Sequence, residues 1–164
     1  MTEPHQKIGD PVAAVRWGGI DDNARRAGYL GLLPFAAALM CVLFGASDEI
    51  RTLGLRVALA WGAVILSFIA AVHWGLALAG RWRWSMTVVI VSTLPSVVGA
   101  LALLIGGERG VALLIAGFGS FWLLEHRRLS ADLPADYLAL RRVLSLAVCA
   151  LLALTAFAVA GENT

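Results

Sequence analysis

The ionisable side chains that could do chemistry in this chain lie inside apolar stretches. His73 and Trp74 interrupt the segment FIAAVHWGLALAG (68–80), and Glu125 and His126 end a later apolar stretch. An imidazole titrates near neutral pH and can hydrogen-bond a carboxylate, so a histidine beside a glutamate can pass a proton. The same pair could bind the head group of a quinone. These four residues form the candidate polar site.

A structural role is the alternative for both ionisable groups. In that interpretation His73 hydrogen-bonds a backbone carbonyl of a neighbouring helix, and Glu125 pairs with Arg128 or Arg25. A carboxylate at mid-bilayer costs roughly 2.5–3.5 kcal/mol, so Glu125 must face protein, water or a partner in either case. The sequence favours the structural interpretation. A cavity shared by the two side chains and open to lipid or cytoplasm would favour the chemical one.

Other reaction types lack the residues that they need. The chain has no HExxH motif, no GxSxG motif and no cysteine set, since Cys41 and Cys149 each lie alone in an apolar stretch. A net charge of +2 is too small to indicate a nucleic-acid partner. We expect no catalytic residue, no metal site and no cofactor other than the quinone considered above.

The composition indicates that lipid surrounds most of the chain. Hydrophobic residues make up 60% of the 164 residues and charged residues 15%. Soluble domains usually contain roughly 45–50% apolar and about 25% charged residues. The mean hydropathy is +0.81, and the apolar residues are gathered in long blocks. The expected partner is therefore the lipid bilayer.

Five blocks are long enough to cross a membrane, which takes roughly 20 apolar residues in a helix. They are continuous rather than alternating in polarity, so helices are expected and not the strands of a barrel. The predicted fold is an all-α bundle of five transmembrane helices. It occupies residues 25–160, after a tail at 1–24 that could lie on the membrane surface and before a short tail at 161–164. The predicted spans are about 27–45, 53–79, 85–105, 110–128 and 141–160.

The distribution of basic residues predicts the orientation, because cytoplasmic loops are rich in Lys and Arg. With the N-terminus in the cytoplasm, three basic residues lie outside, namely Arg51, Arg56 and Arg109. The other ten lie inside: Lys7, Arg16, Arg25, Arg26, Arg81, Arg83, Arg127, Arg128, Arg141 and Arg142. We therefore predict a cytoplasmic N-terminus and a periplasmic C-terminus.

Two groups of residues are expected at the cytoplasmic headgroups. Arg81, Trp82, Arg83 and Trp84 form a short connection in which arginines can meet lipid phosphates and tryptophans lie at the boundary. Around the start of the fifth helix, expected near residue 134, Tyr137, Arg141 and Arg142 are predicted to anchor the chain in the same way.

The second span contains a line of small residues every fourth position. Ala63, Ser67, Ala71, Gly75 and Ala79 are predicted to form a packing ridge, because small residues let membrane helices approach closely. His73 would then point roughly away from that ridge.

Proline residues interrupt two other spans. Pro34 and Pro95 fall midway along the first and third spans and are expected to bend them, because proline lacks a backbone donor.

Four segments resemble a known family. They are LGLLPF (30–35), SFIAAVHWGLAL (67–78), LPSVVGALAL (94–103) and LPADYLALRRVLS (133–145). In that order they are similar to the segments of domain of unknown function family 3429, over about residues 25–150. The HWG and P…Y…LR elements are the most distinctive. The family often has an aromatic residue where this chain has Asp136.

The resemblance implies a five-helix protein of a bacterial inner membrane, because the family occurs there and, as transmembrane protein 69, in mitochondria. It implies no reaction. Packing features outnumber chemical ones, so we expect a non-enzymatic protein that acts by association with other membrane subunits. Its expected role is to assist or assemble a respiratory or other energy-converting complex. The alternative is a small quinone-binding or proton-handling protein that uses His73 and Glu125.

Overall fold

The computed structural model describes residues 19–129 and 133–161. Most of the predicted tails, 1–24 and 161–164, therefore lies outside the described residues. The helices are α1 (Asp22–Leu30), α2 (Leu33–Phe44), α3 (Asp48–Leu78), α4 (Met86–Ile105), α5 (Gly107–Leu124) and α6 (Ala135–Ala160). A π-helical turn, η1 (Glu125–Leu129), continues α5.

Among the described residues, five helical stretches are long and apolar enough to cross a membrane. Four of them are built on single helices, α3 to α6, and the first combines α1 and α2 over Asp22–Phe44. The prediction of an all-helical, five-span membrane protein is confirmed. α3 begins at Asp48, ahead of the span predicted from about 53, because the Ser47 hydroxyl accepts a bond from the Ile50 N–H and caps the helix.

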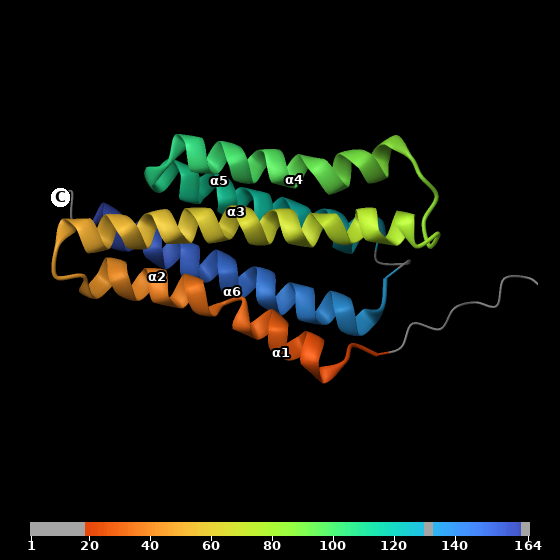
Figure 1. The fold of residues 1–164 in the computed structure, drawn as a ribbon, viewed down its shortest axis with the longest axis horizontal. Helices are drawn as coiled ribbons and strands as arrows, with labels where there is room; N and C mark the ends of the chain where they lie inside the picture. The colour runs from red at the N-terminus through yellow and green to blue at the C-terminus, as the bar shows by residue number, and fades with distance from the viewer. Residues whose placement is uncertain (1–18, 130–132, 162–164) are drawn as a thin grey trace, which may run out of the picture.

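The connections alternate between the two ends of the bundle (Figure 1). The start of α1, the α3–α4 connection and the start of α6 lie at one end, and the α2–α3 and α4–α5 turns lie at the other. Arg25, Arg81, Arg83 and Arg142 thus share one end, and Arg51 and Arg109 share the other. This grouping agrees with the distribution of basic residues from which the orientation was predicted. The orientation of the protein in the membrane itself stays a prediction.

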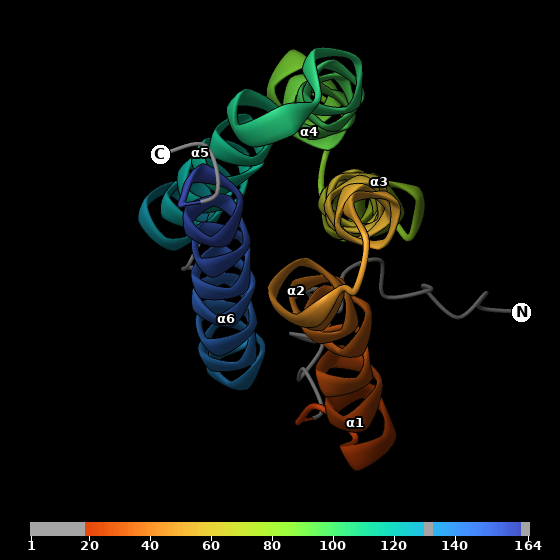
Figure 2. The same cartoon turned by 90° about the vertical axis from the view of Figure 1, so that its left-hand side faces the viewer.

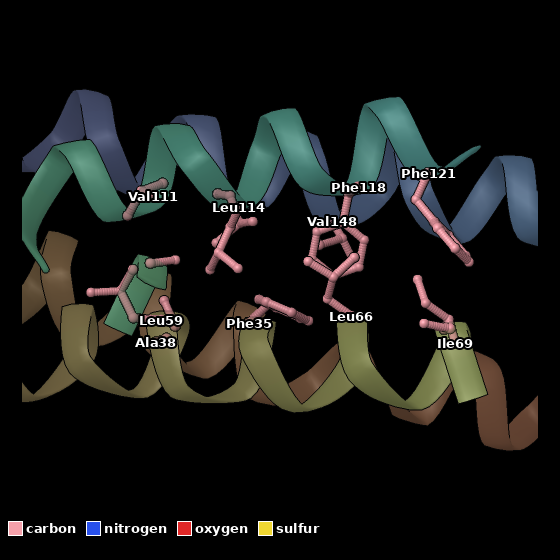
Figure 3. Close-up of a cluster of buried hydrophobic side chains, with 14 of the residues drawn as sticks. Phe35, Ala38, Leu59, Leu66, Ile69, Val111, Leu114, Phe118, Phe121 and Val148 are labelled. Carbon is pink, nitrogen blue, oxygen red and sulfur yellow. The ribbon is translucent and has the colours of Figure 1, made fainter. Parts of the chain in front are cut away.

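α3 lies between α4 and α2 and makes its most extensive contacts with these two helices (Figure 2). α5 and α6 pack on each other, and contacts of α3 with α5 and of α2 with α6 close the bundle. Figure 3 shows the core between these helices, where Leu66 of α3 faces Phe118 of α5. Phe35, Leu114 and Leu152 are also fully buried there.

The predicted ridge on α3 is wrong in its second half. Ala63 is buried, but Ala71, Gly75 and Ala79 are exposed, and nothing lies within 4 Å of a Cβ placed on Gly75. A helix has 3.6 residues per turn, so a line of every fourth residue rotates by about 40° per step and leaves the packed face. The buried line of α3 takes steps of three and four residues, through Ala58, Gly62, Leu66, Ile69, His73 and Ala77.

The expected bend at Pro34 is instead a break between two helices. α1 ends at Leu30 and α2 begins at Leu33, with Pro34 in its first turn. Proline has no N–H, so it cannot donate to the Leu30 carbonyl and a continuous helix is not favoured. The Trp61 indole of α3 donates a hydrogen bond of 2.9 Å to the Gly31 carbonyl inside the break. Pro95, by contrast, is buried within α4, which runs on through it.

Replacing Trp61 with phenylalanine is expected to destabilise the protein by about 1 kcal/mol, because the Gly31 carbonyl then loses its indole donor. Reversible unfolding of purified protein in detergent measures this loss. Trp84→Phe is the control, since Trp84 is exposed and should change stability by less than about 0.5 kcal/mol. Equal stability of the two variants would contradict a role for the indole hydrogen bond.

Candidate functional site: a buried polar cluster

Four polar side chains from three helical elements meet at one end of the bundle. They are His73 of α3, Glu125 of η1, and Tyr137 and Arg141 of α6, and we call them the polar cluster. Arg141 donates from Nη2 and Nε to Glu125 Oε2, at 2.9 and 3.2 Å. Tyr137 donates its hydroxyl to Glu125 Oε1 at 3.3 Å, and His73 Nε2 lies 3.5 Å from the same oxygen. Both oxygens of the carboxylate therefore have partners.

Three of the four side chains of the polar cluster are almost completely shielded, and Tyr137 is partly buried. His73 and Glu125 are each 1% exposed, and Arg141 is 7% exposed. A charge in such a place is tolerated when it is paired and hydrogen-bonded. The two charge-assisted bonds from Arg141 provide that compensation, and the guanidinium also lies 5.7 Å from the centre of the Phe121 ring.

Local geometry explains how these groups meet. Tyr137 and Arg141 are four residues apart on α6, so they project from the same face one turn apart. Glu125 begins the π-helical turn at the end of α5. Such turns interrupt the regular register of a helix and are frequent at functional sites.

The His73 ring has oxygen atoms beside both of its nitrogens. Nδ1 lies 3.3 Å from the Ala70 carbonyl oxygen, and Nε2 has Glu125 Oε1 at 3.5 Å but no hydrogen bond within the usual limits. A neutral imidazole has one N–H and can donate to only one of these oxygens. The protonated ring can donate to both.

Aromatic rings flank His73. The Trp82 ring lies 5.3 Å from it at a tilt of 45°, and the Phe121 ring lies 5.3 Å away edge-on at 86°. The Ser145 hydroxyl, one turn beyond Arg141 on α6, is buried and has no hydrogen-bond partner among the described residues. The surroundings of the cluster are thus aromatic on one side and hold a further polar group along α6.

Two of the four predicted site residues are elsewhere. Trp74 is exposed and packs edge-on against Trp84, with ring centres 5.0 Å apart. His126 is exposed and stacks on Trp122 at 5.6 Å. Each directly follows a cluster residue in the sequence, and successive side chains on an α-helix point about 100° apart. The structure brings together His73 and Glu125 and leaves Trp74 and His126 on the outside.

Tyr137 and Arg141 were predicted to be headgroup anchors. In the structure their side chains instead hydrogen-bond Glu125. Glu125 thus pairs with Arg141 and not with Arg25, and the side chain of Arg128 lies outside those described. Two features of the sequence pointed to Tyr137 and Arg141 as partners of Glu125. The two residues are four positions apart, and the Glu125 carboxylate in an apolar stretch needs a cation.

The remaining predicted anchors lie at the surface of the same end of the bundle. Arg81, Arg83, Trp84 and Arg142 are exposed there. Trp82 is half-buried because its ring covers His73.

A sequence profile of the family described as "Protein of unknown function (DUF3429)" matches residues 20–157, which include the whole polar cluster. The chain belongs to this family. The assignment made from the four sequence segments is thus confirmed. No curated protein and no solved structure in the comparisons matches the chain.

In this member of the DUF3429 family, the cluster can hold a proton in several places. The carboxylate, the imidazole and the phenol can each bind or release one, while the guanidinium stays charged. Within residues 19–129 and 133–161, no group of three His, Cys, Asp or Glu side chains could hold a metal ion. The two hollows nearest to the cluster are lined by Trp82 and Phe121 but not by His73 or Glu125, so neither is the open, shared cavity that would favour a chemical role. Direct proton transfer between His73 and Glu125 is the chemistry that the arrangement itself allows.

Proposed function

We propose that this multi-pass membrane protein lies in a bacterial inner membrane and takes up and releases a proton at the His73–Glu125 pair. One observation carries the proposal: His73 and Glu125, both almost fully buried, come from separate helices and contact each other. Ionisable residues inside membrane spans are expensive, and proton relays are among their recurrent uses.

The step itself needs only the residues of the cluster. A proton on His73 Nε2 breaks its bond to nitrogen and forms one to Glu125 Oε1, which leaves a neutral imidazole and a neutral carboxyl. The 3.5 Å separation must shorten toward the usual hydrogen-bond range for this transfer. Arg141 balances the carboxylate before the proton arrives, and Tyr137 orients Oε1 through its hydroxyl.

Proton flux into proteoliposomes tests this function. Under an imposed pH gradient, vesicles that contain the protein should acidify faster than empty vesicles. His73→Gln should slow the protein-dependent flux by about tenfold or more, because glutamine can donate a hydrogen bond but cannot carry the proton. A pH-sensitive dye inside the vesicles reports the rate.

His126→Gln is the matched control, because His126 is exposed and outside the cluster, and its flux should equal that of the unaltered protein. Flux no faster than in empty vesicles, or equal flux from the His73→Gln variant, would remove the proposal.

Quinone binding at the same pair is less well supported. Trp82 and Phe121 flank His73, so a head group that approached from their side would have to displace a ring before reaching Nε2. Binding of a quinone analogue that is lost in His73→Ala would favour this use of the site.

Association with other membrane subunits, as in a respiratory or other energy-converting complex, is a second proposal. It is favoured by the exposed Ala71, Gly75 and Ala79, which form a line of small residues on the outer surface of α3. Such lines allow close helix contacts in membranes. Purification from native membranes in mild detergent should recover stoichiometric partners, and Gly75→Leu should lose them. A clean monomer from the unaltered chain would contradict this proposal.

A further inference from the structure

Two surface hollows meet at Val91 of α4. The first, about 300 Å³, lies at the start of α4 and is lined by Arg81, Arg83, Ser85 and Thr87 as well as Val91. The second, about 270 Å³, lies between α4 and α5 and has an almost wholly apolar lining, which includes Leu94, Pro95, Val98, Gly117 and Phe121. Each is near the lower limit of roughly 300–1,000 Å³ for ligand sites.

The two hollows follow one face of α4. Thr87, Val91, Leu94 and Val98 are separated by four, three and four residues, which places them in one line along a helix. A molecule that lies along this line passes from a basic, hydroxyl-rich end of the span into an apolar groove deeper in the span.

The chemistry of the linings indicates an amphiphile with an anionic head. The charged side chains that line the first hollow are both guanidiniums, Arg81 and Arg83, which bind phosphate oxygens through several N–H donors. The second hollow can cover an apolar chain. Gly117 in its lining lets α5 pack closely on the neighbouring helices, since a Cβ there would lie 3.0 Å from Val98 Cγ1 and 2.9 Å from Leu66 Cδ2.

We propose that these joined hollows bind one anionic phospholipid. Its phosphate lies between Arg81 and Arg83 beside the Thr87 hydroxyl, and one acyl chain follows Leu94 and Val98 along the groove with α5. The site is independent of the proposed proton transfer. Trp82 and Phe121 nevertheless line the hollows and flank His73, so the lipid would contact the aromatic walls of the polar cluster.

Native mass spectrometry of the full chain in mild detergent tests the site with two added lipids of identical acyl chains, phosphatidylglycerol and phosphatidylcholine. One phosphatidylglycerol should bind about tenfold more tightly than phosphatidylcholine. The double variant Arg81→Gln/Arg83→Gln should lose this preference. Arg127→Gln/Arg142→Gln, which removes two exposed arginines at the same end of the bundle, should retain it.

The apolar half has its own test. Leu94→Trp fills the groove and should weaken binding of both lipids, whereas Val89→Trp, on another face of α4, should not. Inorganic phosphate should fail to displace the lipid. Equal binding of the two lipids, an unchanged preference in the Arg81/Arg83 variant, or displacement by inorganic phosphate would each overturn the proposal.

Discussion

Replacing Arg141 with alanine is expected to destabilise the protein by about 3–5 kcal/mol, which is the loss typical of removing one partner from a buried ion pair. The reason is that the Glu125 carboxyl, in a place that is 1% exposed, loses both of its guanidinium hydrogen bonds and the only cation that pairs with it among the described residues. Reversible unfolding in detergent, followed by helical circular dichroism, measures the loss.

Two controls separate charge pairing from a general effect of the substitution. Arg142→Ala removes the neighbouring, exposed arginine and should change stability by less than about 0.5 kcal/mol. The double variant Glu125→Leu/Arg141→Met removes both charges, and at least about half of the stability lost in Arg141→Ala should return. If the double variant is the least stable of the three, the unpaired carboxylate is not the cause.

Adding one methyl group at Gly54 is expected to destabilise the protein by about 1–3 kcal/mol, through overpacking. A Cβ on Gly54 of α3 would lie 2.7 Å from the backbone oxygen of Ala38 and 2.8 Å from Cys41 Cβ, both in α2. Because one of these atoms belongs to the main chain of another helix, the two helices must separate. Thermal unfolding of Gly54→Ala in detergent measures the cost.

Gly75→Ala is the matched control on the same helix. Nothing lies within 4 Å of a Cβ there, and alanine favours a helix over glycine by up to about 1 kcal/mol. This variant should therefore equal or slightly exceed the unaltered protein in stability. Equal destabilisation of the two variants would mean that the packed face of α3 has been assigned incorrectly.

The five spans could be predicted because the apolar length that marks a span belongs to a whole segment of sequence. Apolar length decides whether a segment can cross a bilayer, and no single residue has to be placed correctly. The packed face of α3 was harder to predict. A strict four-residue repeat of small residues drew attention to Gly75, although the buried line needs steps of three as well as four.

The polar cluster was predictable only in part. The positions of His73 and Glu125 in apolar stretches suggested one polar site, but a sequence does not say which of two adjacent arginines turns inward. Arg141 and Arg142 have the same chemistry and neighbouring positions, and they differ by about 100° around the helix axis. That rotation puts Arg141 on the buried carboxylate and leaves Arg142 at the surface. The same rotation excluded Trp74 and His126.

The break at Gly31 and Leu32 bears on how the chain enters the bilayer during synthesis. α1 has 9 residues and α2 has 12, so neither reaches the length of roughly 20 that a lone spanning helix requires. A backbone carbonyl without a hydrogen-bond donor is costly in hydrocarbon. The donor to the Gly31 carbonyl is Trp61 of α3, and α3 emerges from the ribosome after α1 and α2. The first span therefore has its backbone hydrogen bonds satisfied only when α3 is beside it, and the two spans are expected to insert together as a helical hairpin.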